Sequence, residues 1–140
     1  MSYQKSSKYY QILIICSILV FGCKQTTTNI NKIEIHTVDK EIITCFRITC
    51  AGFDTSFSFN QFTIIDKITL NKIEYCLNKL KLNNSQYEGD IRTKAIITYN
   101  SRKKQDTLSI GFHPEVMYMN GRKYIYDNEL FELIEQSQLK

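Results

Sequence analysis

The residues with the clearest chemical potential in this chain of 140 are its five cysteines. A thiolate can accept a lipid, pair in a disulfide or bind a metal. Cys23 directly follows an apolar run, whereas Cys45, Cys50 and Cys76 lie in the body of the chain. The interval between Cys45 and Cys50, with no histidine close by, does not fit a zinc site. We therefore expect no metal, and we assign Cys23 a different chemistry from the other thiols.

Carboxylates offer a second route to chemistry, through general acid–base pairs. Carboxylates at helical spacing more often form a solvated face than a catalytic pair. The candidates are Asp54, Asp66, Glu129, Glu132 and Glu135. His36 is expected on the solvent side of a strand and His113 in a loop, and the sequence has no nucleophile-elbow, phosphate-loop or zinc-protease motif. We predict a protein without enzymatic activity or cofactor, with a hydrolase built on an unrecognised carboxylate pair as an alternative.

The amino-terminal segment has the layout of an export signal. Lys5 and Lys8 make the first ten residues basic, and residues 12–22 form an uncharged run of eleven. A helix that crosses a bilayer needs about 20 apolar residues, so this run is too short to span. A basic stretch followed by a short apolar run is typical of a secretory signal peptide.

The run ends in Leu19-Val20-Phe21-Gly22-Cys23, which resembles the lipobox of bacterial lipoproteins. In that family an aliphatic residue lies three positions before the cysteine and a small residue lies directly before it, as Val20 and Gly22 do here. The resemblance implies a signal peptide over residues 1–22, cleavage between Gly22 and Cys23, and acyl chains such as palmitate on Cys23. A membrane anchor on the mature amino terminus follows from it.

Residues 23–31 comprise the lipidated cysteine and a polar tether of a few residues. By resemblance to the sorting of Gram-negative lipoproteins, Lys24 favours the outer membrane with the domain facing the periplasm. In a cell with one membrane the same anchor implies its outer face. Without Lys5 and Lys8 the chain keeps 16 basic and 14 acidic residues, a net charge of +2. This small charge gives no footprint for nucleic-acid binding.

Residues 32–140 are expected to form one α+β domain with the element order βββ-α-ββββ-α. Alternating apolar residues predict strands at Lys32–Val38, Ile42–Cys50, Phe53–Ile65, Ile91–Tyr99, Asp106–Phe112, Val116–Met119 and Arg122–Tyr126. Helical spacing predicts helices at Thr69–Leu82 and at Asn128–Gln138, the second capped by Asp127. Asn120-Gly121 is typical of a type I′ hairpin turn. Because hairpins dominate, we expect an antiparallel sheet covered by two helices.

The thiols of the domain leave three alternatives open. Cys50 shares a predicted strand face with Phe46 and Ile48, and Cys76 lies at the edge of the apolar stripe of the first helix. A Cys50–Cys76 disulfide could therefore join sheet to helix in an oxidising compartment. Cys45–Cys50 is a local alternative, although an odd interval in one strand points the side chains apart. The third alternative is that all three thiols are free core residues.

One surface suggests binding. The predicted hairpin around Asn120-Gly121 gathers residues of types that are enriched in protein interfaces. They are Tyr118, Arg122, Lys123, Tyr124 and Tyr126. The alternative is that these tyrosines cover the core of a domain without tryptophan. We expect a lipid-anchored envelope protein that acts as a protein-binding, inhibitor or immunity-like module, or else as an accessory in envelope assembly.

Overall fold

The computed structural model describes residues 28–38, 42, 46–56, 60–101, 105–112 and 115–139, and its centre is a six-stranded antiparallel sheet. The strands are β1 (Ile30–Thr37), β2 (Asn60–Ile64), β3 (Asp90–Tyr99), β4 (Asp106–Phe112), β5 (Val116–Met119) and β6 (Arg122–Tyr124). They lie in the order β2-β1-β3-β4-β5-β6. The helices are α2 (Phe53–Ser56), α3 (Lys67–Leu77), α4 (Asn128–Gln136) and a final 3-10 turn, η1 (Ser137–Leu139). The predicted α+β class with an antiparallel sheet is confirmed.

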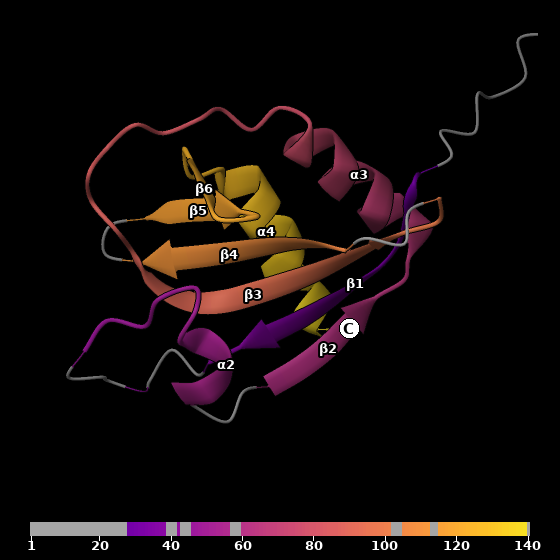
Figure 1. Ribbon diagram of the computed structural model, residues 1–140. Helices are drawn as coiled ribbons and strands as arrows, with labels where there is room; N and C mark the ends of the chain where they lie inside the picture. Colours follow the sequence, from indigo (N-terminus) through magenta and orange to yellow (C-terminus); the bar gives the residue numbers. More distant parts are fainter. Residues whose placement is uncertain are drawn as a thin grey trace, which may run out of the picture.

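The two larger helices pack on one face of the sheet, and α2 lies on the other, nearer the viewer in Figure 1. Each larger helix begins at a side-chain cap. Asp66 accepts a hydrogen bond from the Thr69 backbone N–H, and Asp127 accepts one from that of Leu130. The predicted cap at Asp127 is thus confirmed. The predicted helix at Thr69–Leu82 is found as α3, which begins two residues earlier and ends five residues earlier. Such caps supply partners for the unsatisfied N–H groups of a first turn.

The main core fills the space between the sheet and these two helices. It joins one face of each central strand to the apolar stripes of α3 and α4. Its buried members are Ile30, Ile33, Ile35, Ile64, Leu70, Ile73, Cys76, Ala95, Ile97, Leu108, Ile110, Met117, Leu130 and Ile134. The predicted inward face of the first strand, with Ile33 and Ile35, is confirmed.

The predicted strands at Ile42–Cys50 and Phe53–Ile65 are the main errors of the sequence analysis. Residues 46–52 form turns and irregular backbone, and Phe53 begins the short helix α2. Only the end of the second segment is a strand, as β2. Ile48 is buried because this connection packs against the front of the sheet, and its carbonyl accepts a hydrogen bond from the Ile91 backbone N–H. The described elements therefore follow the order β-α-β-α-ββββ-α.

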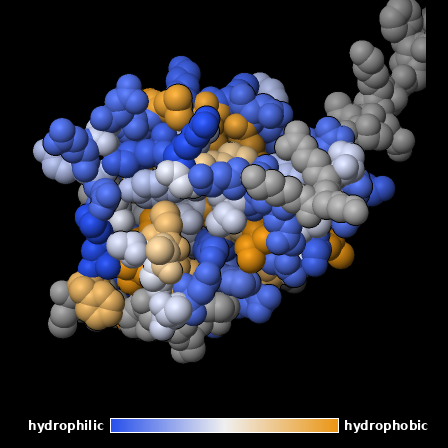
Figure 2. Space-filling view, in the orientation of Figure 1, coloured by the Kyte–Doolittle hydropathy of each residue, from blue (hydrophilic) through white to orange (hydrophobic). Residues whose placement is uncertain are grey.

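A second, smaller core lies on the front face, beneath this connection. It contains Val38, Ile48, Phe53 and Ile91, with Cys50 and Tyr118 packed against it. A β-bulge at Arg92 shifts the pairing of β3 with β4, so Ile91 lies opposite Gly111 whereas Thr93 lies opposite Ile110. The bulge turns Ile91 away from the main core. Around this small core the front of the molecule is mostly hydrophilic, with small hydrophobic patches (Figure 2).

The hairpin of β5 and β6 turns at Asn120 and Gly121, which have φ angles of 51° and 79°. These positive values confirm the predicted type of turn, which Asn-Gly favours. The chain before β3 runs along the outer edge of β6. Leu82 bridges Tyr124, and the backbone N–H groups of Asn83 and Ile125 complete this contact. The β6 edge of the sheet is thereby covered.

The predicted signal peptide, Cys23 and the predicted polar tether up to Thr27 lie outside the described residues, as do Cys45 and His113. The described part of the chain contains no helix that is long and apolar enough to cross a membrane.

Candidate functional site

The hairpin residues singled out from the sequence do not form one surface. Strand alternation sends them to opposite faces of the sheet, since Tyr118 lies opposite Lys123 and Met117 opposite Tyr124. Tyr118 packs on the front core, whereas Tyr124 and Tyr126 pack on the main core behind the sheet. The alternative interpretation, that these tyrosines cover the core, describes them better. Arg122 is exposed at the turn.

Lys123 has a structural task in this hairpin. Its Nζ donates a hydrogen bond of 2.8 Å to the carbonyl of Ser85 and a second one to the carbonyl of Tyr87. The ammonium group also lies 5.8 Å from the ring centre of Tyr118. These bonds hold the connection between α3 and β3 against the hairpin. Lys123 is therefore occupied within the domain rather than offered to a partner.

That connection forms one wall of a cavity of about 230 Å³ on the front face. The floor is apolar and comes from Ile91, Tyr118 and Cys50. The rim carries Arg47 and Glu88, whose ion pair is 2.5 Å long. The cavity lies at the end of the sheet where β1 ends and β3 begins, since the Val38 backbone N–H donates to the carbonyl of Arg92. We call it the distal pocket, because it lies at the opposite end of β1 from Ile30.

Asp90 fixes the loop that forms the second wall of the distal pocket. One oxygen of its carboxylate accepts a hydrogen bond of 2.7 Å from the Ile48 backbone N–H. The other accepts one of 2.8 Å from Nε of Arg92. A second ion pair joins Lys94 on β3 to Asp54 on α2. The walls are thus held to the sheet by charged hydrogen bonds, which are stronger than neutral ones.

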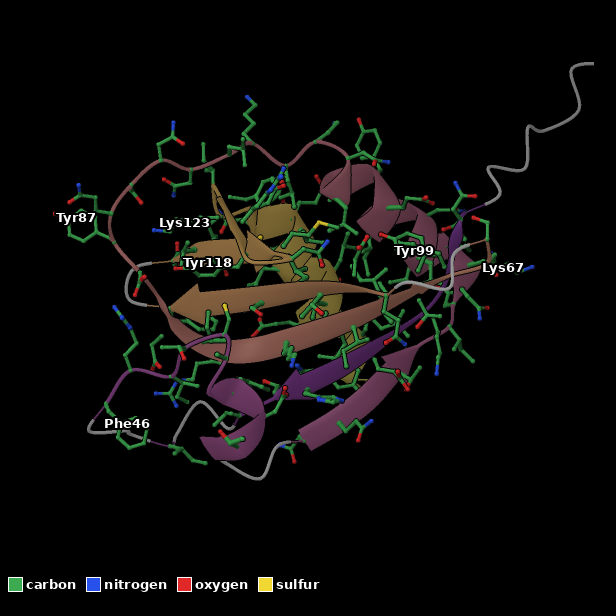
Figure 3. All side chains as sticks on the ribbon, viewed as in Figure 1. Phe46, Lys67, Tyr87, Tyr99, Tyr118 and Lys123 are labelled. Carbon is green, nitrogen blue, oxygen red and sulfur yellow. The ribbon has the colours of Figure 1, made fainter. Side chains whose placement is uncertain are left out.

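Two aromatic side chains stand exposed beside the distal pocket. Phe46 is 61% exposed and Tyr87 is 75% exposed, and each immediately precedes one member of the Arg47–Glu88 ion pair. Figure 3 shows both at the end of the molecule opposite Lys67. Aromatic residues are of the type that is enriched at protein interfaces. Sequence reasoning missed this site because its residues come from two connections that only the fold brings together.

Within the distal pocket, Cys50 and Tyr118 are in their protonated forms at neutral pH. Burial raises the pKa of the Cys50 thiol, and a hydrogen bond to Ser109 and the charge of Lys94 oppose this only in part. Burial likewise raises the pKa of the Tyr118 hydroxyl. Since a thiolate is the nucleophilic form of cysteine, Cys50 is poorly suited to covalent chemistry.

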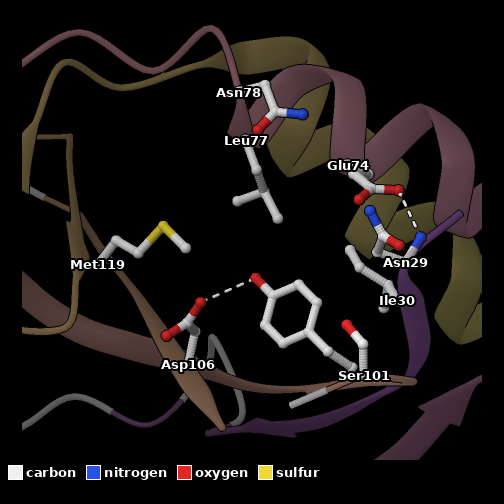
Figure 4. Close-up of a pocket in the computed structure, with 9 residues that line it drawn as sticks. Asn29, Ile30, Glu74, Leu77, Asn78, Ser101, Asp106 and Met119 are labelled. Atoms are coloured by element: carbon white, nitrogen blue, oxygen red, sulfur yellow. Dashed lines mark hydrogen bonds between the residues drawn. The ribbon is translucent and has the colours of Figure 1, made fainter. Parts of the chain in front are cut away.

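A polar cavity of about 330 Å³ lies at the other end of the sheet, between α3 and the start of β1 (Figure 4). Two carboxylates line it. Glu74 accepts hydrogen bonds from the Thr28 hydroxyl and the Asn29 backbone N–H, at 2.7 and 3.1 Å. Asp106 accepts a 2.8 Å bond from the Tyr99 hydroxyl and one from the Asn120 side-chain amide. Both carboxylates therefore serve to fix neighbouring segments.

The proposed Cys50–Cys76 disulfide is not formed, and both thiols are free. Cys50 belongs to the front core and Cys76 to the main core, so the sheet separates them. The error follows from the predicted strand at Ile42–Cys50, which pointed Cys50 toward the helices.

The carboxylates proposed as a catalytic pair have separate tasks. Asp54 pairs with Lys94 and Asp66 caps α3, while Glu129, Glu132 and Glu135 lie along α4. His36 lies in β1, half-buried, on the face away from Ile33 and Ile35. Across the described ranges, acidic, histidine and cysteine side chains do not gather in threes that could hold a metal.

Comparison with known proteins finds no matching family model, no matching curated protein and no matching solved structure. The function must therefore be argued from the residues of this chain.

Proposed function

We propose that this chain is a lipid-anchored protein of the bacterial envelope that binds another protein through the end of the domain that carries the distal pocket. The single observation that carries the binding proposal is the exposure of Phe46 and Tyr87 beside that pocket. Aromatic residues are enriched where proteins meet.

The anchor part of the proposal rests on the residues before the domain. The short apolar run and the Leu19–Cys23 segment support acylation of Cys23, with residues 1–22 removed. Two or more acyl chains would hold the protein to a membrane essentially permanently. The domain would then face the periplasm from the outer membrane, or the exterior from a single membrane.

The direction of β1 links the two parts of the proposal. This strand begins at Ile30, next to the tether, and its eight residues span roughly 26 Å toward the distal pocket. An anchored domain can thus hold Phe46 and Tyr87 away from its own membrane attachment. The pocket volume of about 230 Å³ suits one apolar side chain of a partner, with the Arg47–Glu88 pair at its rim. An apolar anchor in a pocket with a polar rim is the usual pattern of a hot spot.

Site-specific photocrosslinking tests the binding proposal in cells that express the full chain. A photoreactive amino acid at position 46 or 87 should give the same discrete adduct, because both positions flank one pocket. The same residue at Tyr75, which is 57% exposed on α3, is the matched control. Adducts identical at all three positions, or absent at 46 and 87, would refute binding at the distal pocket.

The anchor has its own test, which is the intact mass of the membrane-extracted protein beside a Cys23→Ser variant. The expected mass is that of residues 23–140 with diacylglyceryl and acyl groups, and the variant should lose them. A mass that begins at Met1 without lipid would refute the anchor and leave the distal pocket to be judged by crosslinking alone.

A further inference from the structure

The outward face of α3 and of the turn after it carries an unusual set of exposed side chains. Ile68, Lys72, Tyr75 and Lys79 follow one another at intervals of four, three and four residues, so they share one stripe. Ile68 is 68% exposed and Tyr75 is 57% exposed, while Leu70, Ile73 and Cys76 point into the core. Lys79 Nζ lies 3.7 Å from the ring centre of Tyr75. We call this stripe the outer face of α3.

The chain enters the domain directly beside this helix. Glu74 of α3 accepts hydrogen bonds from the hydroxyl of Thr28 and from the backbone N–H of Asn29. Only residues 24–27 separate Thr28 from Cys23. Fully extended, those five steps span at most about 18 Å. An acylated Cys23 would therefore hold Thr28 within that distance of the lipid headgroups, and the turn of α3 at Glu74 directly beside it.

We propose that the outer face of α3 rests on the bilayer surface, with Ile68 inserted at the headgroup boundary and Lys72 and Lys79 against anionic headgroups. This inference rests on the proposed lipid anchor. Isoleucine, tyrosine and lysine on one stripe are the composition of helices that lie in the membrane interface. Tyrosine favours the headgroup level, and lysine can bury its stem while keeping its charge in water.

The distribution of charge favours a bilayer over a protein as the occupant. Lys72 and Lys79 make the stripe basic, and the acidic residue of α3, Glu74, is occupied by the tether. The neighbouring helix α4 carries Glu129, Glu132 and Glu135 and no basic residue, so it disfavours an anionic membrane. Contact with anionic lipid is therefore expected to stop at α3. Phe46 and Tyr87 lie at the end of the molecule opposite Lys67, the first residue of α3 (Figure 3).

The absence of tryptophan from the sequence allows a direct test. In a Tyr75→Trp variant of the full, acylated chain, position 75 carries the only tryptophan. The protein is reconstituted into vesicles of phosphatidylethanolamine and phosphatidylglycerol that contain a lipid with a spin label near its headgroup. We expect strong quenching of the tryptophan emission in this variant. The matched control is Tyr87→Trp, whose emission should be quenched far less.

Substitutions on the stripe separate docking from anchoring. Attraction between a lysine and an anionic surface favours the docked state. Lys72→Gln should therefore lower the ratio of docked to free domain about fivefold, and the double variant Lys72→Gln, Lys79→Gln should lower it about 25-fold. Ile68→Asp should abolish quenching without unfolding the domain, because position 68 is exposed and an acidic residue suits the first turn of a helix. Circular dichroism of each variant verifies the fold.

Flotation of the same vesicles distinguishes the outcomes. If the protein floats and the Tyr75→Trp variant is quenched no more than the Tyr87→Trp variant, the docking proposal is wrong and the anchor stands. If the emission of Tyr75→Trp is blue-shifted without lipid quenching, a second copy of the chain covers the outer face of α3, and docking on lipid is again refuted. If the protein does not float, the anchor fails, and the docking proposal falls with it.

Discussion

Ile91 and Thr93 lie two positions apart in β3, yet their side chains face opposite sides of the sheet. Arg92 between them is a bulge residue, so Ile91 pairs with Gly111 and Thr93 with Ile110. Thr93 is buried behind the sheet, while Ile91 fills the small front core. A regular strand would have placed both in the main core. The floor of the distal pocket therefore depends on this one irregularity.

Substitution of Gly111 by alanine should destabilise the domain, because the added methyl group would crowd the backbone of Gly89 beside the bulge. A Cβ at this position would lie 3.2 Å from the Cα and carbonyl carbon of Gly89 and 3.2 Å from Cδ1 of Ile91. Backbone atoms cannot move aside cheaply, so we expect a loss of about 1–3 kcal/mol in the free energy of unfolding. Urea denaturation measures it.

Gly121→Asn is the matched control for this substitution. Gly121 has φ of 79°, a Cβ added there would meet nothing within 4 Å, and asparagine tolerates that backbone region. We expect a loss of about 1 kcal/mol, because a side chain at a φ of 79° strains the backbone even where there is space for it. A Gly111→Ala protein as stable as the parent would show that the front core tolerates the extra volume.

The domain should lose stability in alkaline solution, and Tyr126 should account for part of the loss. Burial, together with the negative charges of Glu115, Glu135 and Glu132, raises the pKa of its hydroxyl far above the usual range. The unfolded chain releases this proton near pH 10, whereas the folded chain keeps it. Stability is therefore full below about pH 10 and is lost as pH rises above it.

A Tyr126→Phe variant should show a flatter decline of the urea midpoint between about pH 9 and 11 than the parent protein. Tyr87→Phe, at an exposed position, should decline as the parent does. The interpretation would be wrong if both variants lost stability with the same slope as the parent.

Removal of the Lys123 ammonium group should loosen the connection between α3 and β3. Lys123→Met keeps much of the aliphatic stem but loses the hydrogen bonds to the carbonyls of Ser85 and Tyr87. We expect a loss of about 1–2 kcal/mol and faster amide exchange over residues 83–89. Arg122→Met, one residue earlier at an exposed position, should leave that exchange unchanged. Equal amide exchange over residues 83–89 in the two variants would show that Lys123 does not hold this connection in place.

The thiols of Cys50 and Cys76 should remain free and react slowly in the folded protein. Burial raises the pKa of both, so less thiolate is present at any given pH than for an ordinary cysteine. Alkylation should therefore be slow at neutral pH and rise only under alkaline conditions, and urea should accelerate it. Peptide mapping after alkylation measures this, and a peptide that links Cys50 to Cys76 would contradict it.

Much of the fold could be predicted from local signals in the sequence. Asn120-Gly121 and the cap at Asp127 act through neighbouring backbone groups, so they could be predicted without knowledge of the rest of the chain. The segment around Ile48 could not, because its burial comes from contact with β3, more than forty positions away. Its apolar residues alternate as those of a strand do, although residues 46–50 form no strand.

The candidate site was harder to foresee than the fold. The tyrosines near Asn120-Gly121 were grouped because they are close in sequence, although a two-residue turn pairs Met119 with Arg122 and so already implies that Tyr118 and Tyr124 face apart. Phe46 and Tyr87 carry no local signal of exposure. They lie at the same end of the molecule because Asp90 and Lys123 hold two distant connections there.

The position of β1 within the sheet has a mechanical consequence. The amino-terminal segment continues into this strand, which lies between β2 and β3 and is hydrogen-bonded to both. Inter-strand hydrogen bonds run perpendicular to the strands. Tension along β1 would therefore load its hydrogen bonds to β2 and to β3 together, in shear, and could not break them one at a time. A domain held by its amino terminus and pulled at the distal pocket should therefore resist force better than one whose tether led into an edge strand.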